Sequence, residues 1–199
     1  MPSRRLREYV TAAVCVAATV SGFLAVGSVR ASSQPDPGTV EHVLDYDYQV
    51  QETGYWCAAA AARIALSARG IEVPQAELAE FMGVTPDIGL PYIENLERAL
   101  DTYTGDGYYE VKYAANHPDL RERLLWDVRY NIDRGHAVVI NVIRIGGAYF
   151  PGGHYATIVG YRDGGSEYLV ADPANADRAH AWIPAAEISN GIKLYRFVA

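Results

Sequence analysis

The stretch that ends at residue 57 contains the residue types that acyl-transfer chemistry requires. Gln51 lies six residues before Cys57, and Trp56 comes directly before the cysteine. The alanine-rich run that follows predicts a helix that opens at Cys57, and the positive end of such a helix stabilises negative charge on sulfur. The Gln51 amide and the Cys57 backbone N–H could then donate to the oxyanion of a tetrahedral intermediate, where one donor is worth about 3 kcal/mol of barrier.

His154 and Asp172 supply the other two groups that a cysteine nucleophile needs. His154 follows Gly152-Gly153 at the start of a β-branched run, and Asp172 stands before Pro173 at the end of another. As a base, His154 would take the thiol proton and later protonate the leaving group, while Asp172 would orient the imidazole ring. Taken singly, each has a structural explanation, as a half-buried strand histidine and a turn-capping aspartate. Their combination with Cys57 in one Cys-His-Asp site is what the family resemblance given below implies.

The other four histidines are weaker candidates. His42 lies before the first expected strand, and His117 and His180 lie in expected loops. His136 precedes a β-branched run and is the one rival for the role of base. None of them has a metal-ligand spacing to another histidine or to Cys57, so we expect neither a metal nor a cofactor.

Residues 1–31 predict an export signal. Three arginines begin the chain, the run Val10–Val26 is almost wholly apolar, and small residues lead up to Ser32. A retained membrane anchor is the alternative, but the apolar run is shorter than the roughly 20 residues that a span prefers. We expect cleavage before Ser32, a disordered lead-in over 32–38 and a domain over 39–199, long enough for one hydrophobic core.

Removal of residues 1–31 would leave an acidic chain with one thiol. The whole chain has a net charge of -7, and residues 1–31 contain four Arg and one Glu, so the remainder carries -10. An acidic surface repels phosphate backbones, which argues against a nucleic-acid partner. Because Cys15 leaves with the signal, Cys57 has no intramolecular partner. In an exported protein this indicates either an intermolecular bridge or a thiol kept for its chemistry.

The patterning along the chain predicts an α+β fold with helices early and strands late. Proline in the first turn, helical spacing of apolar residues and a terminal glycine mark the helices, and β-branched runs between glycines mark the strands. The helices expected are 57–68, 74–82, 91–102 and 119–134; the strands expected are 43–50, 108–113, 137–145, 155–161, 167–171 and 192–198.

The spacing of these motifs resembles the papain-like cysteine peptidases, above all their C39-like branch. Glutamine, four residues and an aromatic-Cys pair that opens a helix are followed by Gly-Gly-His and, later, by Ala-Asp-Pro. The resemblance covers about 45–197 and implies N-terminal helices packed on a mostly antiparallel sheet. It also implies Cys57, His154 and Asp172 as the triad, with Gln51 in the oxyanion hole. One departure is Cys57-Ala58-Ala59, where the family commonly has Cys-Gly-Pro.

The resemblance implies hydrolysis of a peptide or amide bond through a thioester, with a peptide or protein as the substrate. Trp56 and Tyr155 are candidate substrate contacts, together with the expected loop 148–151, because they adjoin the proposed site in sequence. Since the chain ends at Ala199 with no transporter segment, we expect a free secreted enzyme that has no stable membrane association once the signal is removed.

Two other functions remain open. A transglutaminase-like enzyme or a cell-wall amidase would use the same three groups for another acyl transfer, although Gln51 favours the peptidase. A catalytically silent papain-like domain that binds an extended peptide is favoured only by the Cys57-Ala58-Ala59 departure.

Overall fold

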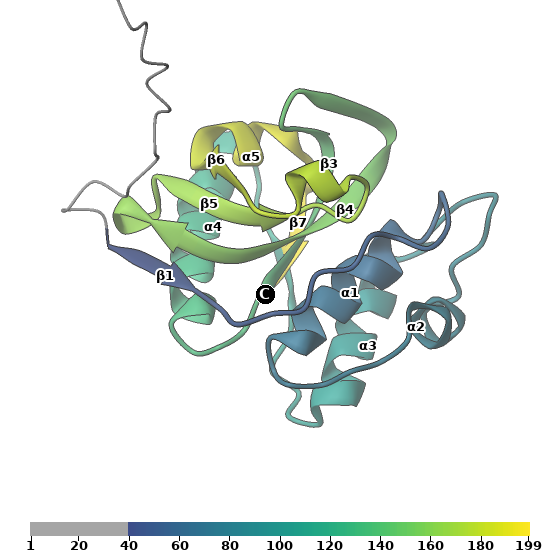
Figure 1. Ribbon diagram of the computed structural model, residues 1–199. Coiled ribbons are helices and arrows are strands. Elements are labelled where there is room, and N and C mark those ends of the chain that lie inside the picture. The colour runs from purple at the N-terminus through teal and green to yellow at the C-terminus, as the bar shows by residue number, and fades with distance from the viewer. Residues whose placement is uncertain (1–39) are drawn as a thin grey trace, which may run out of the picture. The chain divides into compact units, whose positions relative to one another are not determined.

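The computed structural model describes residues 40–199, and the predicted export signal and lead-in lie outside these residues. Figure 1 shows helices and a sheet built from different parts of the chain, so the predicted α+β fold is confirmed. The helices are α1 Cys57–Ser67, α2 Gln75–Met82, α3 Ile93–Thr104, α4 His117–Ile132 and α5 Ala185–Gly191. The strands are β1 Glu41–Val43, β2 Val111–Tyr113, β3 Val138–Ile145, β4 Ala148–Arg162, β5 Glu167–Ala171, β6 Ala181–Pro184 and β7 Ile192–Val198.

The strands form a single antiparallel sheet. Its order is β2-β7-β3-β4-β5-β6, and β1 pairs with β4 outside this path. Each strand pair is antiparallel, and β4 contributes to pairs with β1, β3 and β5. The long central strand β4 therefore organises the sheet, and it is the strand that carries His154.

Helices cover both faces of the sheet. Neighbouring residues of a strand point to opposite faces, so strand β3 contributes apolar side chains to a core on each side. Val139 of β3 belongs to the apolar core that includes the buried residues of α1, α2 and α3. Ile140, the next residue, belongs to a second core with Leu124 of α4 and Ile188 of α5. Figure 1 shows the same arrangement, with α1 and α3 on one side of the sheet and α4 on the other.

Helix α1 lies close against the sheet because its sheet-facing side chains are small. Residues 58–62 are all alanines and are at most 1 % exposed. Thr157 of β4, itself fully buried, donates a hydrogen bond from Oγ1 to the backbone oxygen of Ala61 at 2.9 Å. The helix that begins at Cys57 is thus fixed to the strand that carries the proposed base. Among residues 40–199, no helix is both long and apolar enough to cross a lipid bilayer.

The prediction of a strand over 43–50 was wrong. Strand β1 ends at Val43, and residues 44–50 belong to no strand. Several polar groups in this stretch bond to side chains instead: Asp47 to Arg63 and Ser67 of α1, and Val50 to Gln75 of α2. The mixed aromatic and β-branched pattern is therefore explained by packing on the helices rather than by pairing in the sheet.

Other boundaries also differ from the sequence expectation. Residues 148–151 were expected to form a loop, but β4 begins at Ala148 because Gly146 and Gly147, both with positive φ, make the tight turn after β3. His117 was also expected in a loop, yet it begins α4, where the Asn116 side chain accepts a hydrogen bond from the Asp119 N–H. Strand β6 and helix α5 were not predicted.

Candidate active site

Cys57 is the first residue of α1, as its position before the alanine run predicted. The chain turns into the helix at Trp56, whose N–H donates to the backbone oxygen of Thr53 at 3.3 Å and whose own carbonyl accepts the Ala60 N–H at 2.9 Å. The Cys57 thiol is free and partly exposed. It lies at the positive end of the helix, where a negative sulfur is favoured.

The structure brings His154 and Asp172 together. Strands β4 and β5 are neighbours, with Thr157 opposite Ala171, so Asp172 leaves β5 beside the part of β4 that carries His154. The His154 Nε2 lies 2.6 Å from the Asp172 Oδ1. Both side chains are buried, with exposed fractions of 3 % and 1 %, so water screens their interaction little.

The pKa of His154 shows how its neighbours act on the ring. Burial works to lower this pKa, but hydrogen bonds to Asp172 and to Cys57, with the charges of both, outweigh burial and raise the pKa of His154 to about 9. Because Nε2 faces Asp172, Nδ1 is the ring nitrogen left for the thiol. The imidazole thus lies between sulfur and carboxylate, which is the order that a thiol, base and orienting acid require.

Gln51 lies on the segment that precedes the turn into α1. Its Nε2 donates to the Thr53 backbone oxygen at 2.7 Å, which uses one of the two N–H bonds of the amide. Its backbone N–H donates to the Pro173 oxygen at 2.9 Å. The Gln51 segment is therefore tied to the chain directly after Asp172.

Two further residues contact the proposed site: Tyr48, which sequence reasoning missed, and Phe150, which it placed in a candidate substrate loop without relating it to His154. The Phe150 ring stacks on the His154 imidazole, with ring centroids 4.2 Å apart and planes 20° apart. The Tyr48 hydroxyl donates to the Asp172 backbone oxygen at 2.8 Å. The even spacing of Phe150 and His154 on one strand would have placed them on the same face, had β4 been predicted to begin before residue 151.

Trp56 and Tyr155 adjoin the site, but they differ in accessibility. Trp56 is half-buried, with its ring edge-on to Tyr55. Tyr155 is 7 % exposed and packs in the core that contains α1, where burial raises its pKa to about 12. Tyr155 therefore supports the helix under the thiol, and contact of either residue with a substrate stays a prediction.

The rival base and the departure from the Cys-Gly-Pro pattern each have a structural setting of their own. His136 stacks on Tyr108 with centroids 3.6 Å apart, and burial followed by the charge of Arg69 lowers its pKa. The groups around His136 are thus not those of the Cys57 site. Ala58 is 1 % exposed, so its methyl group lies in the core and not on the accessible surface around the thiol.

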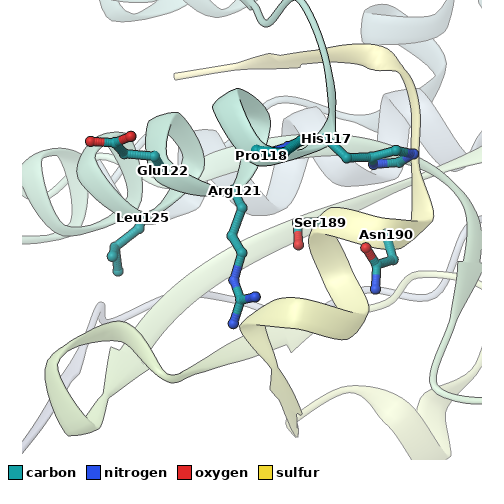
Figure 2. Close-up of a pocket in the computed structure, with 7 residues that line it drawn as sticks. All are labelled: His117, Pro118, Arg121, Glu122, Leu125, Ser189 and Asn190. Carbon is teal, nitrogen blue, oxygen red and sulfur yellow. The ribbon is translucent and has the colours of Figure 1, made fainter.

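One pocket in the described part of the chain lies away from these residues. It has a volume of about 520 Å³ and lies between α4 and α5, where Arg121 extends between the two helices (Figure 2). None of the proposed site residues lines it. Residues 40–199 also contain no cluster of three or more His, Cys, Asp or Glu side chains that could hold a metal ion.

A cysteine at a helix N-terminus, beside a buried His-Asp pair on an antiparallel sheet, defines the class of papain-like cysteine peptidases. The chain belongs to the Peptidase_C39 like family, whose model matches residues 43–196. It is thus a C39-like cysteine peptidase domain, as the spacing of its motifs predicted.

Solved structures of similar fold agree with this assignment. One is a double glycine motif protease from an AMS/PCAT transporter, solved in complex with a leader peptide. This protease is 17 % identical in sequence, with a TM-score of 0.52, and the match covers 78 % of this chain and 91 % of that chain. Another is the peptidase domain of Streptococcus ComA, a bifunctional ABC transporter, which is 15 % identical with a TM-score of 0.54 over 78 % and 97 %. No curated protein sequence matches the chain.

Proposed function

We propose that Cys57, His154 and Asp172 form a catalytic triad that hydrolyses a peptide bond through a thioester intermediate. The observation that carries the proposal is the buried pair of His154 and Asp172, 2.6 Å apart, together with the influence of Cys57, which also acts to raise the pKa of the same imidazole. A histidine with only a structural role in a strand would not require both a buried carboxylate and a thiol as neighbours.

In the proposed reaction, the Cys57 sulfur attacks the carbonyl carbon, and the C=O electron pair moves onto the oxygen. The thiol proton is transferred to His154, and the second Gln51 N–H with the Cys57 backbone N–H receives the oxyanion. When the intermediate collapses, the C–N bond breaks and His154 passes its proton to the leaving amine. Water, deprotonated by His154, then attacks the thioester, and the carboxylic acid and the free thiol are released.

Asp172 keeps the ring in place through these steps. Its Oδ1 also accepts the Ala174 N–H at 2.9 Å, so the carboxylate is held by the turn that follows β5. Because the pKa of His154 is raised to about 9, the ring that has taken the thiol proton keeps it at neutral pH until the leaving amine accepts it.

The proposed substrate is an extended peptide. The structural relative that binds a leader peptide is a double glycine motif protease, so peptides with a Gly-Gly pair before the scissile bond are the first probes to use.

We also propose that the enzyme is exported, since residues 1–31 have the charge and apolar pattern of an export signal.

The Cys57→Ala variant tests the proposal. We expect hydrolysis of a Gly-Gly peptide carrying a fluorogenic amide to vanish, while the circular dichroism spectrum and the melting temperature stay close to those of the wild type. Because the domain from residue 40 on contains no other cysteine, its labelling by iodoacetamide at mildly acidic pH reports on this thiol alone. Undiminished turnover in Cys57→Ala would refute the proposal, and amine incorporation in place of hydrolysis would assign an acyl transferase instead.

A further inference from the structure

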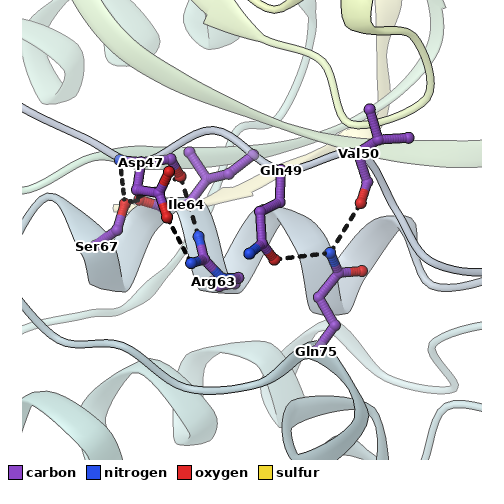
Figure 3. Close-up of polar contacts among 7 residues, drawn as sticks. All are labelled: Asp47, Gln49, Val50, Arg63, Ile64, Ser67 and Gln75. Carbon is purple, nitrogen blue, oxygen red and sulfur yellow. Dashed lines mark hydrogen bonds and ion pairs between the residues drawn. The ribbon is translucent and has the colours of Figure 1, made fainter.

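Gln75, the first residue of α2, is a completely buried amide that the proposed reaction does not use. Its Oε1 accepts the backbone N–H of Glu52 at 3.0 Å. Its Nε2 donates to the backbone oxygen of Val50 at 2.9 Å and to the Gln49 Oε1 at 3.3 Å (Figure 3). One side chain thus bonds to the residues on both sides of Gln51.

The other side of the same segment is tied to the strand half of the fold. The Gln51 N–H donates to the Pro173 oxygen at 2.9 Å, and the Tyr48 hydroxyl donates to the Asp172 oxygen at 2.8 Å. Residues 48–52 therefore bridge α2 and the end of β5, with Gln51 in the middle of the bridge.

A second anchor holds the segment further upstream. The buried Arg63 of α1 bonds to the backbone oxygen of Asp47 at 3.2 Å and pairs with its carboxylate. The Ser67 hydroxyl accepts the Asp47 N–H at 2.9 Å (Figure 3). Asp47 lies four residues from Gln51, whereas Gln75 bonds to the residues adjacent to it, so Gln75 controls the local position of Gln51 more directly.

Packing alone does not account for an amide at position 75. An apolar side chain of similar length would fill the same space without the cost of burying polar atoms. The amide adds directional bonds, because two of its three hydrogen bonds fix a backbone that belongs to no sheet ladder.

We propose that Gln75 is the positioning residue of the oxyanion hole. By fixing the backbone at Val50 and Glu52, it holds Gln51 at the height and angle where the free amide N–H meets the oxygen of the carbonyl that Cys57 attacks. The inference rests on the proposed function, since it needs Gln51 to act as an oxyanion donor.

A double-mutant cycle on hydrolysis of the Gly-Gly fluorogenic peptide tests this inference. Gln51→Ala removes the donor and should lower kcat about 100- to 1000-fold. Gln75→Met keeps the length of the side chain but none of its hydrogen bonds, and the displaced donor should lower kcat about 10- to 100-fold with little change in KM. In the double variant we expect the kcat of Gln51→Ala alone, whereas independent effects would multiply.

Two measurements separate positioning from general damage to the fold. Hydrogen exchange of residues 49–52 should accelerate in Gln75→Met, while the rate at which iodoacetamide alkylates Cys57 should not change, because alkylation forms no oxyanion. Asn95→Leu is the matched control, since it removes the hydrogen bond that the Asn95 side chain donates to the Met82 oxygen at the other end of α2. It should lower the melting temperature without changing kcat.

The outcomes distinguish this inference from the proposed function. If the wild type hydrolyses the peptide but the effects of Gln51→Ala and Gln75→Met multiply, or if exchange at 49–52 is unchanged, Gln75 does not position the donor. If Gln75→Met slows alkylation as much as turnover, Gln75 acts through the thiol or the fold. If the wild type hydrolyses no peptide and no peptide aldehyde adds to Cys57, the proposed function fails and this inference fails with it.

Discussion

The substitution Asp172→Asn isolates the contribution of one carboxylate to the proposed site. The amide has nearly the same shape and keeps an oxygen that can accept from His154 Nε2, but the negative charge 2.6 Å from the ring is lost. Without this charge, fewer interactions offset burial, which lowers the pKa of His154. We therefore expect this pKa to fall, by about 1–3 pH units for the loss of an adjacent opposite charge.

The loss of stability expected in Asp172→Asn follows from the raised pKa of His154. A value of about 9 against the ordinary 6.5 means that folding favours the protonated ring by about 3 kcal/mol, at about 1.4 kcal/mol per pH unit. Since the folded pKa lies above the unfolded one, this stabilisation is fully present below pH 6.5 and is lost as the pH rises through about 9. The variant should lack much of it at low pH and differ less from the wild type above pH 9.

The assay is an NMR titration of the histidine ring signals, combined with urea unfolding at pH 6 and pH 9.5. The His154 signal is assigned by its absence in His154→Gln. Asp133→Asn is the matched control, because Asp133 Oδ1 lies 2.9 Å from His42 Nδ1 in a pair of which each side chain is 42 % exposed. It should leave the titration of His154 unchanged. If His154 titrated at the same pH with and without the Asp172 carboxylate, our account of the site would be wrong.

Two further predictions concern the residues around the base. Gly153→Ala should destabilise the protein by about 1–3 kcal/mol in urea unfolding, because φ of Gly153 is +97° and a Cβ there would lie 2.7 Å from Asn141 Oδ1. Gly152→Ala is the control and should not destabilise the protein, because no atom lies within 4 Å of a Cβ at that position. Equal losses of stability in the two variants would contradict this reasoning. Phe150→Ala removes the ring stacked on the proposed base and should lower kcat about 2- to 10-fold, as for a ring contact of about 0.5–1.5 kcal/mol. Tyr149→Ala, at a 60 % exposed position of the same hairpin, serves as the control, and the same loss there would remove the special role of the ring.

The sequence was most informative where local chemistry and local structure coincide. The alanine run predicted the start of α1 at Cys57, and the glycine and proline that flank His154 and Asp172 marked the strands that carry them. Neighbouring antiparallel strands bring such residues together without a special interaction, so their order along the chain, matched to that of the papain-like peptidases, predicted the pair.

The sequence was less informative where tertiary contacts replace local pattern. Residues 44–50 have the composition of a strand, yet their polar groups bond to helix side chains such as Arg63 and Gln75. Nothing in the spacing of Gln75 relates it to Gln51, because the two are 24 residues apart in the chain and meet only through the fold. The stacking of Phe150 on His154 was missed because residues 148–151 were taken as a loop, whereas Gly146 and Gly147 make the turn between two long strands.

The hydrogen bond between Thr157 and Ala61 constrains how the enzyme can work. It fastens β4 three residues beyond His154 to the second turn of the helix that starts at Cys57. Cys57 and His154, the proposed nucleophile and base, therefore lie on two elements that this buried bond joins directly, so their separation is set as the protein folds rather than when a peptide arrives.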